Sequence, residues 1–143
     1  MICADTSFLL SFYGDDMNSE TARWHQSASG LPIHAHALND FEFANALRAL
    51  VFRRKITASH LRQWLAEYEA DKQAGAVRLA LVDANAVLRR AEIISAAMTE
   101  SHGHRAFDIL LVAAAKILGA TEFWSFDGRQ RALADAEGLA VGP

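Results

Sequence analysis

Short apolar runs alternate along the chain with longer segments in which apolar residues recur at intervals of three and four. The short runs are rich in β-branched and aromatic residues and are bounded by Gly, Asp or Ser, which is typical of β-strands. They predict strands at 2–5, 31–35, 77–82, 122–126 and 139–141. Pro32 favours an edge position or a strand start for the second of these.

The periodic segments predict helices, and polar residues or glycines mark where each one begins and ends. The expected N-caps are Asn18 or Ser19, Asn39 or Asp40, Thr57, Asp83 and Asp127. Gly75 and Gly119 are expected to close two helices, and the last two helices are expected at 105–118 and 128–136.

Strands that alternate with helices are typical of an α/β sheet with crossover helices. No repeat, linker or low-complexity segment interrupts the pattern. Residues 1–143 are therefore expected to form a single domain. Right-handed crossovers bring the carboxyl ends of the strands to one edge of the sheet, where α/β proteins place their sites.

Four acidic residues stand at the ends of predicted elements: Asp5, Glu42, Asp108 and Asp127. Asp5 closes the first strand, Asp127 follows the strand at 122–126, and Asp108 and Glu42 lie in the first turns of apolar helices. A carboxylate buried among apolar residues costs several kcal/mol unless its charge is compensated. Four that converge would repel one another and call for a hard divalent cation. The pattern therefore favours metal-assisted phosphoryl chemistry.

Each of these acids also has a local explanation. Asp5 fits ordinary turn chemistry, Asp108 fits a first-turn acid that complements the helix dipole, and Asp127 fits an N-cap. Glu42 is the most ambiguous, because Asp40 competes with it for a metal role. The hypothesis depends on the four residues together.

Composition places the chain among globular proteins, with 52% hydrophobic and 22% charged residues. The net charge of −3 argues weakly against non-specific coating of nucleic acid, but not against an enzyme that cuts it. A basic tract comprises Arg48, Arg53, Arg54, Lys55 and Arg62. We interpret it as a solvated helix end that complements the dipole, with RNA contact as the alternative.

Other features exclude several classes of site. Cys3 is the only cysteine, so no disulfide framework or thiolate metal site is expected. The apolar stretch at 110–118 is too short for a membrane span and carries Lys116, so a cytoplasmic protein is expected. The chain has no phosphate-binding glycine loop and no nucleophile elbow.

The histidines and tryptophans are interpreted as packing residues. His34 and His36, like His102 and His104, are spaced for a shared zinc site, but neither pair has a third ligand nearby. Trp24, Trp64 and Trp124, together with the phenylalanines, are expected in the core rather than on a base-stacking platform.

Several segments resemble the PIN domain family. The opening 2–10 (ICADTSFLL) resembles its first strand, 41–47 its second-acid segment, 105–115 (RAFDILLVAAA) its third-acid helix, and 125–139 its fourth-acid segment and closing strand. The likeness covers essentially the whole chain, and its length suits the compact VapC-type toxins. Arg131 stands where many relatives carry an aromatic residue, and Ser125 where Thr is more usual.

The resemblance implies a three-layer α/β/α PIN-like fold with a central, mainly parallel sheet in strand order 3-2-1-4-5. It also implies a Mg²⁺- or Mn²⁺-dependent endoribonuclease, a homodimer, and a small antitoxin protein that inhibits it. The faces of the helices at 40–54 and 57–74 are the expected antitoxin groove.

We hypothesise that Asp5 and Asp108 hold the principal cation, with Glu42 and Asp127 completing the cluster. Ser7 and Ser125 are expected to orient these groups, and Arg105 and Arg129 to contact RNA phosphate.

Two rival functions remain open. An Asp-nucleophile phosphotransferase typically needs a second Asp two residues after the first, where this chain has Ser7. The other rival is a non-catalytic module of the same fold that binds RNA or a protein.

Overall fold

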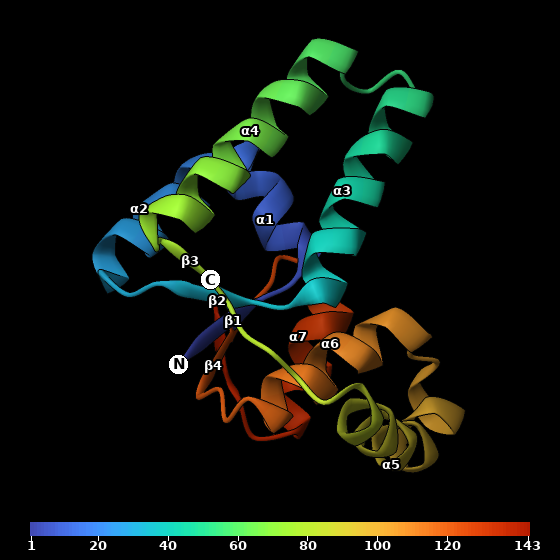
Figure 1. The fold of residues 1–143 in the computed structure, drawn as a ribbon. Coiled ribbons are helices and arrows are strands. Elements are labelled where there is room, and N and C mark those ends of the chain that lie inside the picture. The colour runs from blue at the N-terminus through green and yellow to red at the C-terminus, as the bar shows by residue number, and fades with distance from the viewer.

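A central five-stranded sheet lies between two groups of helices in the computed structural model, which describes residues Met1–Pro143 (Figure 1). The elements, in chain order, are β1 (Ile2–Ala4), α1 (Thr6–Tyr13), α2 (Ser19–Ser29), β2 (Ile33–Ala35), α3 (Ala37–Phe52), α4 (Ala58–Ala74), β3 (Val77–Leu79), α5 (Ala84–His102), α6 (Ala106–Ile117), β4 (Glu122–Trp124), α7 (Gly128–Ala136) and β5 (Ala140–Gly142). None of the helices combines the length and apolar character that crossing a membrane requires.

The strands run in the order β3-β2-β1-β4-β5, and every neighbouring pair is parallel. The predicted strand order 3-2-1-4-5 is therefore confirmed. In the register, Cys3 of β1 pairs with His34 of β2 on one side and Phe123 of β4 on the other. The carboxyl ends of β1 and β4 consequently lie side by side.

Successive side chains along each strand point to opposite faces of the sheet, so the core is divided between the two faces. Cys3 and Phe123 pack with α5, α6 and α7 in one hydrophobic cluster. Ile2, Ile33 and Trp124 point to the opposite face, where α1 and α2 cover them. Helices α3 and α4 extend that second layer as a long antiparallel hairpin that projects from the sheet (Figure 1).

Most predicted helix boundaries hold because their capping residues make the expected bonds. Thr57, Asp83 and Asp127 each accept a hydrogen bond from a backbone N–H of the helix that follows. Gly75 ends α4 in the left-handed conformation, at φ 80°. Here a residue with a Cβ atom would be strained, so glycine suits the position.

Helix α1 is absent from the elements that the hydrophobic pattern predicts. Asp5 is its N-cap, with the side chain accepting from the Phe8 backbone N–H at 2.9 Å. Its central residues are buried on nearly all sides, so no polar face marks a helical period. A run of apolar residues this short reads equally as part of a strand.

The predicted start of α3 is wrong. His36, not Asn39 or Asp40, is the N-cap, and Asn39 at the third helical position reaches back to the His36 backbone N–H at 3.2 Å. Asp40 lies inside the first turn. Its carboxylate accepts from Tyr68 Oη at 2.7 Å and from Lys72 Nζ at 3.1 Å, which fixes α4 against α3.

Two further predictions require correction. The strands at 31–35, 77–82 and 122–126 are each shorter than predicted, three residues long, and β5 begins one residue later than expected. Trp24 is not in the core, because 67% of its surface is exposed on α2, and Phe52 is 87% exposed. The prediction of a buried position holds for Trp124, which is 1% exposed.

Candidate active site

Asp5 lies at the carboxyl end of the central strand β1, directly before α1. Its Oδ1 accepts from the Phe8 backbone N–H at 2.9 Å and from Ser7 Oγ at 2.7 Å. Its Oδ2 accepts from Ser125 Oγ at 2.7 Å, across the sheet from β4. Three donors therefore hold the carboxylate in one orientation.

The carboxyl group of Asp5 is difficult to ionise in this position. The residue is 5% exposed, and burial raises the pKa of Asp5 to about 6, against the opposing effect of its hydrogen bonds from Ser125, Phe8 and Ser7. The negative charge of Glu42 raises this pKa further. Neighbouring negative charge at a desolvated carboxyl is an arrangement that a cation would stabilise.

Glu42 projects from the second turn of α3 and accepts a hydrogen bond from Thr6 Oγ1 at the start of α1. Asn39 fixes α3 to the sheet by donating from Nδ2 to the Ala4 carbonyl oxygen at 2.9 Å. Burial raises the pKa of Glu42, the Thr6 bond lowers it, and the charge of Asp108 raises it.

Asp108 and Asp127 complete the group from α6 and from the loop after β4. Burial raises the pKa of Asp108, and the charge of Asp127 raises it further, while Arg105 and His104 act in the opposite direction. Asp127 caps α7 by accepting from the backbone N–H groups of Arg129 at 2.8 Å and Gln130 at 3.3 Å. Asp127 is exposed, and both capping bonds use its Oδ1.

The four acids thus form a chain of mutually repelling charges, with Asp5 near Glu42, Glu42 near Asp108, and Asp108 near Asp127. As the side chains stand, no three His, Cys, Asp or Glu residues form a group that could hold a metal ion. The donor set nevertheless fits a hard cation, because carboxylate oxygens are the ligands that Mg²⁺ and Mn²⁺ prefer. Asp5, Glu42 and Asp108 also have raised pKa values that positive charge would lower.

The two serines lie where they orient Asp5. Ser7 Oγ and Ser125 Oγ are 3.3 Å apart, and each donates to a different oxygen of the carboxylate. Ser7 also accepts from the Phe126 backbone N–H at 2.9 Å, and Ser125 accepts from the Asp127 backbone N–H at 3.0 Å. The serines thereby connect Asp5 with the loop that carries Asp127.

Three further side chains support the acids without having been predicted to do so. Thr6 bonds Glu42, Asn39 joins α3 to β1, and Gln130 Nε2 donates to the Asp108 carbonyl oxygen at 3.2 Å. Gln130 is 2% exposed, and its Oε1 is buried without a hydrogen-bond partner. A buried glutamine on a helix gives no signal in the sequence, whereas the hydroxyl of Thr6 beside Asp5 does.

The two predicted RNA-binding arginines have similar surroundings. Arg105 and Arg129 are both exposed, Arg105 at the N-cap of α6 and Arg129 in the first turn of α7. Both side chains are without an ion pair. Arg131, by contrast, donates to the carbonyl oxygens of Ser125, at 3.2 Å, and Pro143, so its guanidinium holds the end of the chain.

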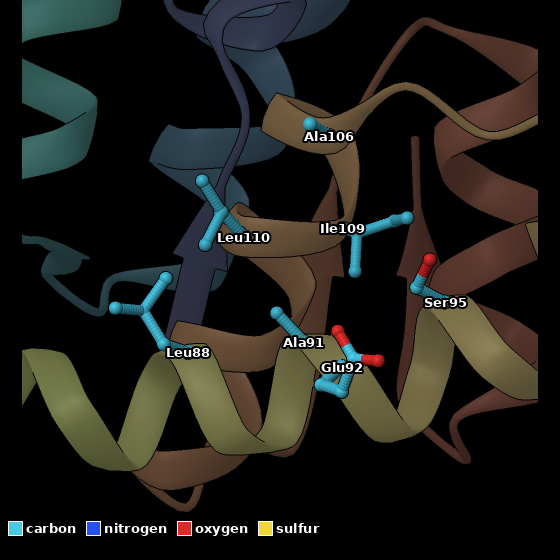
Figure 2. A pocket seen from close by; sticks show the side chains of 7 residues that line it. All are labelled: Leu88, Ala91, Glu92, Ser95, Ala106, Ile109 and Leu110. Atoms are coloured by element: carbon cyan, nitrogen blue, oxygen red, sulfur yellow. The ribbon is translucent and has the colours of Figure 1, made fainter.

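A pocket of about 230 Å³ lies between α5 and α6 (Figure 2). Its lining is mostly apolar and consists of Leu88, Ala91, Glu92, Ser95, Ala106, Ile109 and Leu110. None of the four acids lines it.

The family model described as "PIN domain" matches residues 2–136. The chain belongs to the PIN domain family. A comparison with curated proteins finds no match.

Solved PIN-like structures share the fold at low sequence identity. VapC20 of Mycobacterium tuberculosis, a toxin that cleaves the sarcin–ricin loop, superposes with a TM-score of 0.71 at 18% identity, over 98% of this chain and 97% of that one. FitAcB from Neisseria gonorrhoeae gives a TM-score of 0.63 at 19% identity, over 100% of this chain and 97% of that one. These likenesses establish the three-layer PIN fold predicted from the sequence.

Proposed function

We propose that this PIN domain is a divalent-metal-dependent endoribonuclease that hydrolyses RNA phosphodiester bonds as the toxin of a toxin–antitoxin pair. The observation that carries the proposal is a network of hydrogen bonds that brings together four elements, each of which carries one acid. Ser125 connects Asp5 with the loop of Asp127, Thr6 after Asp5 donates to Glu42 on α3, and Gln130 on α7 donates to the Asp108 carbonyl oxygen on α6. Local capping explains Asp127 and part of Asp5, but it does not explain why Glu42 and Asp108 are half-buried close to other acids.

Asp5 and Asp108 would hold the principal Mg²⁺ or Mn²⁺ ion, with Glu42 and Asp127 contributing directly or through water. Mg²⁺ usually keeps several waters and takes only one or two carboxylates, so the four need not all bind it. When bound, the cation supplies charge neutralisation at the scissile phosphate and lowers the pKa of a bound water.

The chain's own residues have three tasks in this proposal. Ser7 and Ser125 hold Asp5 in one orientation, which keeps a metal ligand from rotating away. Glu42, bonded to Thr6, holds negative charge on the α3 side of the group. Arg105 and Arg129 present free guanidinium groups beside Asp108 and Asp127, where they would bind RNA phosphate.

The toxin role, the antitoxin partner and a cytoplasmic place of action are part of the same proposal. The likeness to VapC20 supports the toxin role, since that protein is a toxin that cleaves the sarcin–ricin loop. A small antitoxin would lie along the hairpin of α3 and α4.

A homodimer would cover exposed leucines at the β3 edge of the sheet. Leu79 is 55% exposed, Leu81 is fully exposed and Leu88 is 57% exposed, all close together along the chain from β3 into α5. Burial of these exposed apolar side chains in a subunit contact would be favourable.

One observation favours a second candidate, a PIN-fold module that binds RNA or protein without catalysis. The acids do not form a metal-binding group in their present orientations, and both oxygens of Asp5 already accept hydrogen bonds. A non-catalytic module would bind RNA in Mg²⁺ or Mn²⁺ and leave it intact.

Cleavage of RNA by the purified protein and by Asp108→Asn separates these candidates. The endoribonuclease would give discrete fragments in Mg²⁺ or Mn²⁺, none with a chelator, and none from the variant. Near wild-type cleavage by a folded Asp108→Asn protein would refute the metal assignment. Growth arrest on induced expression of the wild type, but not of Asp108→Asn, tests the toxin role.

A further inference from the structure

The turn between α3 and α4 carries an isolated concentration of positive charge. We name Arg48, Arg53, Arg54, Lys55 and Arg62 the hairpin tip. Residues 43–66 contain five of the 14 basic residues of the chain and none of its 17 acidic residues. The other nine basic residues and all 17 acidic residues lie in the rest of the chain. The tip is therefore a positively charged region of a protein whose net charge is negative.

The side chains of the tip have no partners within the protein. All five are exposed, and none takes part in an ion pair. None donates a side-chain hydrogen bond either, whereas Arg23, Arg90 and Arg131 all do. The charges therefore contribute no contact that holds the fold together.

Complementarity with a helix dipole does not account for the tip, contrary to the interpretation from sequence. Helix α3 ends at Phe52, where a cation is favourable, but α4 begins at Ala58, where a cation is unfavourable. Both helix ends meet at the same turn, so the two effects oppose each other. The first turn of α4 contains no acidic residue that would offset the unfavourable effect of the cations there.

The backbone conformation of Arg54 is further evidence that the basic residues of the hairpin tip do not stabilise the fold. Its φ of 57° makes it the one non-glycine residue in the left-handed region. The turn closes with bonds from Arg54 N–H to the Val51 carbonyl oxygen and from Lys55 N–H to the Leu50 carbonyl oxygen, at 2.9 Å each. Glycine usually occupies this position after a helix, so an arginine there is held at a cost in strain.

Phe52 adds an aromatic surface beside these charges. It is the last residue of α3 and is 87% exposed, although burial would be favourable for its ring. Figure 1 shows the turn at the far end of the hairpin, away from the sheet. An exposed ring next to free cations is the arrangement that single-stranded nucleic acid recognises, through base stacking and phosphate pairing.

We propose that the hairpin tip binds the phosphate backbone of single-stranded RNA while Phe52 stacks on a base. A peptide of acidic residues would neutralise the cations but would offer no ring to stack on Phe52, so RNA is the better match. The inference rests on the proposed function, since the bound strand would be the substrate of the acidic group. Arg53 follows Glu42 by eleven residues of α3, so about 16 Å of helix separates the two. The tip would anchor the strand several nucleotides from the cut.

Salt-dependent binding of a fluorescein-labelled single-stranded RNA of mixed sequence, in chelator, tests this anchor. The test variant is Arg53→Gln/Lys55→Gln, and the matched control is Arg78→Gln/Arg89→Gln, which removes two exposed charges from β3 and α5. Each phosphate contact is worth about fivefold in about 0.1 M salt and about 0.7 in the log–log salt slope. We expect the test variant to bind about 25-fold more weakly with a slope shallower by about 1.4, and the control to change binding by less than about twofold.

A second variant, Phe52→Leu, separates stacking from charge. It keeps an apolar side chain and all five cations, so affinity should fall while the salt slope stays that of the wild type. Equal binding by wild type, Arg53→Gln/Lys55→Gln and Phe52→Leu would overturn the proposal. So would loss of poly-glutamate binding in the charge variant with RNA binding unchanged, since the tip would then be a protein-binding surface.

The RNA-binding assay tests the hairpin tip separately from the proposed nuclease function. If the wild type cleaves RNA in metal but the tip variants bind RNA normally, the anchor is wrong and the proposed function stands. If RNA binding depends on the tip and no cleavage occurs in any metal, the anchor stands and the proposed function is wrong.

Discussion

Ser125 Oγ donates a 2.7 Å hydrogen bond to Asp5 Oδ2, although the two residues lie 120 positions apart in the chain. The bond crosses from the end of β4 to the end of β1, and Ser125 is fully buried. It orients the carboxylate that we assign to the metal and lowers the pKa of Asp5 against the effect of burial. The two ends of the chain are joined at the proposed site by this contact.

Replacing Ser125 with alanine removes that donor and the acceptor for the Asp127 backbone N–H. We expect Ser125→Ala to lower the free energy of unfolding by about 1–3 kcal/mol, because the buried carboxylate of Asp5 loses one of its hydrogen-bond donors. The pKa of Asp5 should rise above its wild-type value. Urea unfolding and carboxyl NMR titration measure the two effects. Ser125→Thr keeps the hydroxyl and should retain both properties, and an unchanged Asp5 pKa in the alanine variant would contradict the assigned role.

Asp5 should make the metal-free protein less stable as the pH rises. Its pKa is about 6 in the folded state against 3.8 unfolded, so between about pH 4 and pH 6 the folded state holds a proton that the unfolded state has lost. Stability from this group is present at low pH and declines through that window, by about 3 kcal/mol in all. Asp5→Asn should remove the decline and be at least as stable as wild type at pH 7 without metal.

The pH dependence of the unfolding free energy must be compared between the wild type and Asp5→Asn, because His36 changes it in the opposite direction to Asp5. Burial lowers the pKa of His36 to about 4, so this histidine adds stability as the pH rises from about 4 to 6.5. It does so in both proteins, and the difference between their unfolding free energies isolates Asp5. Asp5→Ala, which loses the N-cap of α1, should instead cost about 1 kcal/mol. A difference that is flat from pH 4 to 6 would contradict the raised pKa.

Divalent cations should stabilise the folded protein, because binding relieves the repulsion among the four acids. A Mg²⁺ or Mn²⁺ concentration of about 100 Kd should add about 2.7 kcal/mol and raise Tm. Asp5→Asn/Asp108→Asn should show no rise, while Asp83→Asn/Asp135→Asn, exposed acids away from the group, should respond as wild type does. Equal responses in the two double variants would assign the binding to the general surface.

Arg54→Gly should stabilise the protein, since glycine accepts a φ of 57° without strain. We expect a gain of about 0.5–1 kcal/mol in the free energy of unfolding, after the entropic cost of glycine. Thermal unfolding measures it, with Arg53→Gly as the control. Arg53 has a φ of −77°, so glycine there should be neutral or destabilising. A loss of stability in Arg54→Gly would show that the arginine side chain holds the turn.

The sheet and most helices are predictable from the sequence, because alternation, capping residues and glycine ends are local signals. The assignment of the four acids to a metal site stays a prediction. The strand order came from resemblance to PIN domains and not from the pattern itself. Helix α1 gives no local signal, since both of its faces are buried. The sequence prediction for the α3 cap is wrong because Asn39 and Asp40 are better capping residues than His36. Their tertiary bonds, from Asn39 to the Ala4 carbonyl oxygen and from Tyr68 to Asp40, have no local signal.

The support around the acids was harder to predict than the acids themselves. Ser7 and Ser125 follow from their neighbours in sequence, whereas Gln130 acts through a carbonyl oxygen on another helix. The exposure of Trp24 and Phe52 also runs against the preference of aromatic residues for the core. The local sequence pattern does not predict which apolar residues stay exposed to solvent in the folded protein.

Metal-dependent cleavage of total cellular RNA by the wild type and by four single variants tests the central claim most directly. The variants are Asp5→Asn, Glu42→Gln, Asp108→Asn and Asp127→Asn, with Asp135→Asn as the control on α7. If the four carboxylates act as one metal-binding group, each variant should lose at least about a hundredfold in rate while staying folded. The wild type and the control should give the same fragments in Mg²⁺ or Mn²⁺ and none in chelator. Cleavage that persists in chelator, or in the Asp5→Asn and Asp108→Asn proteins, would contradict the account.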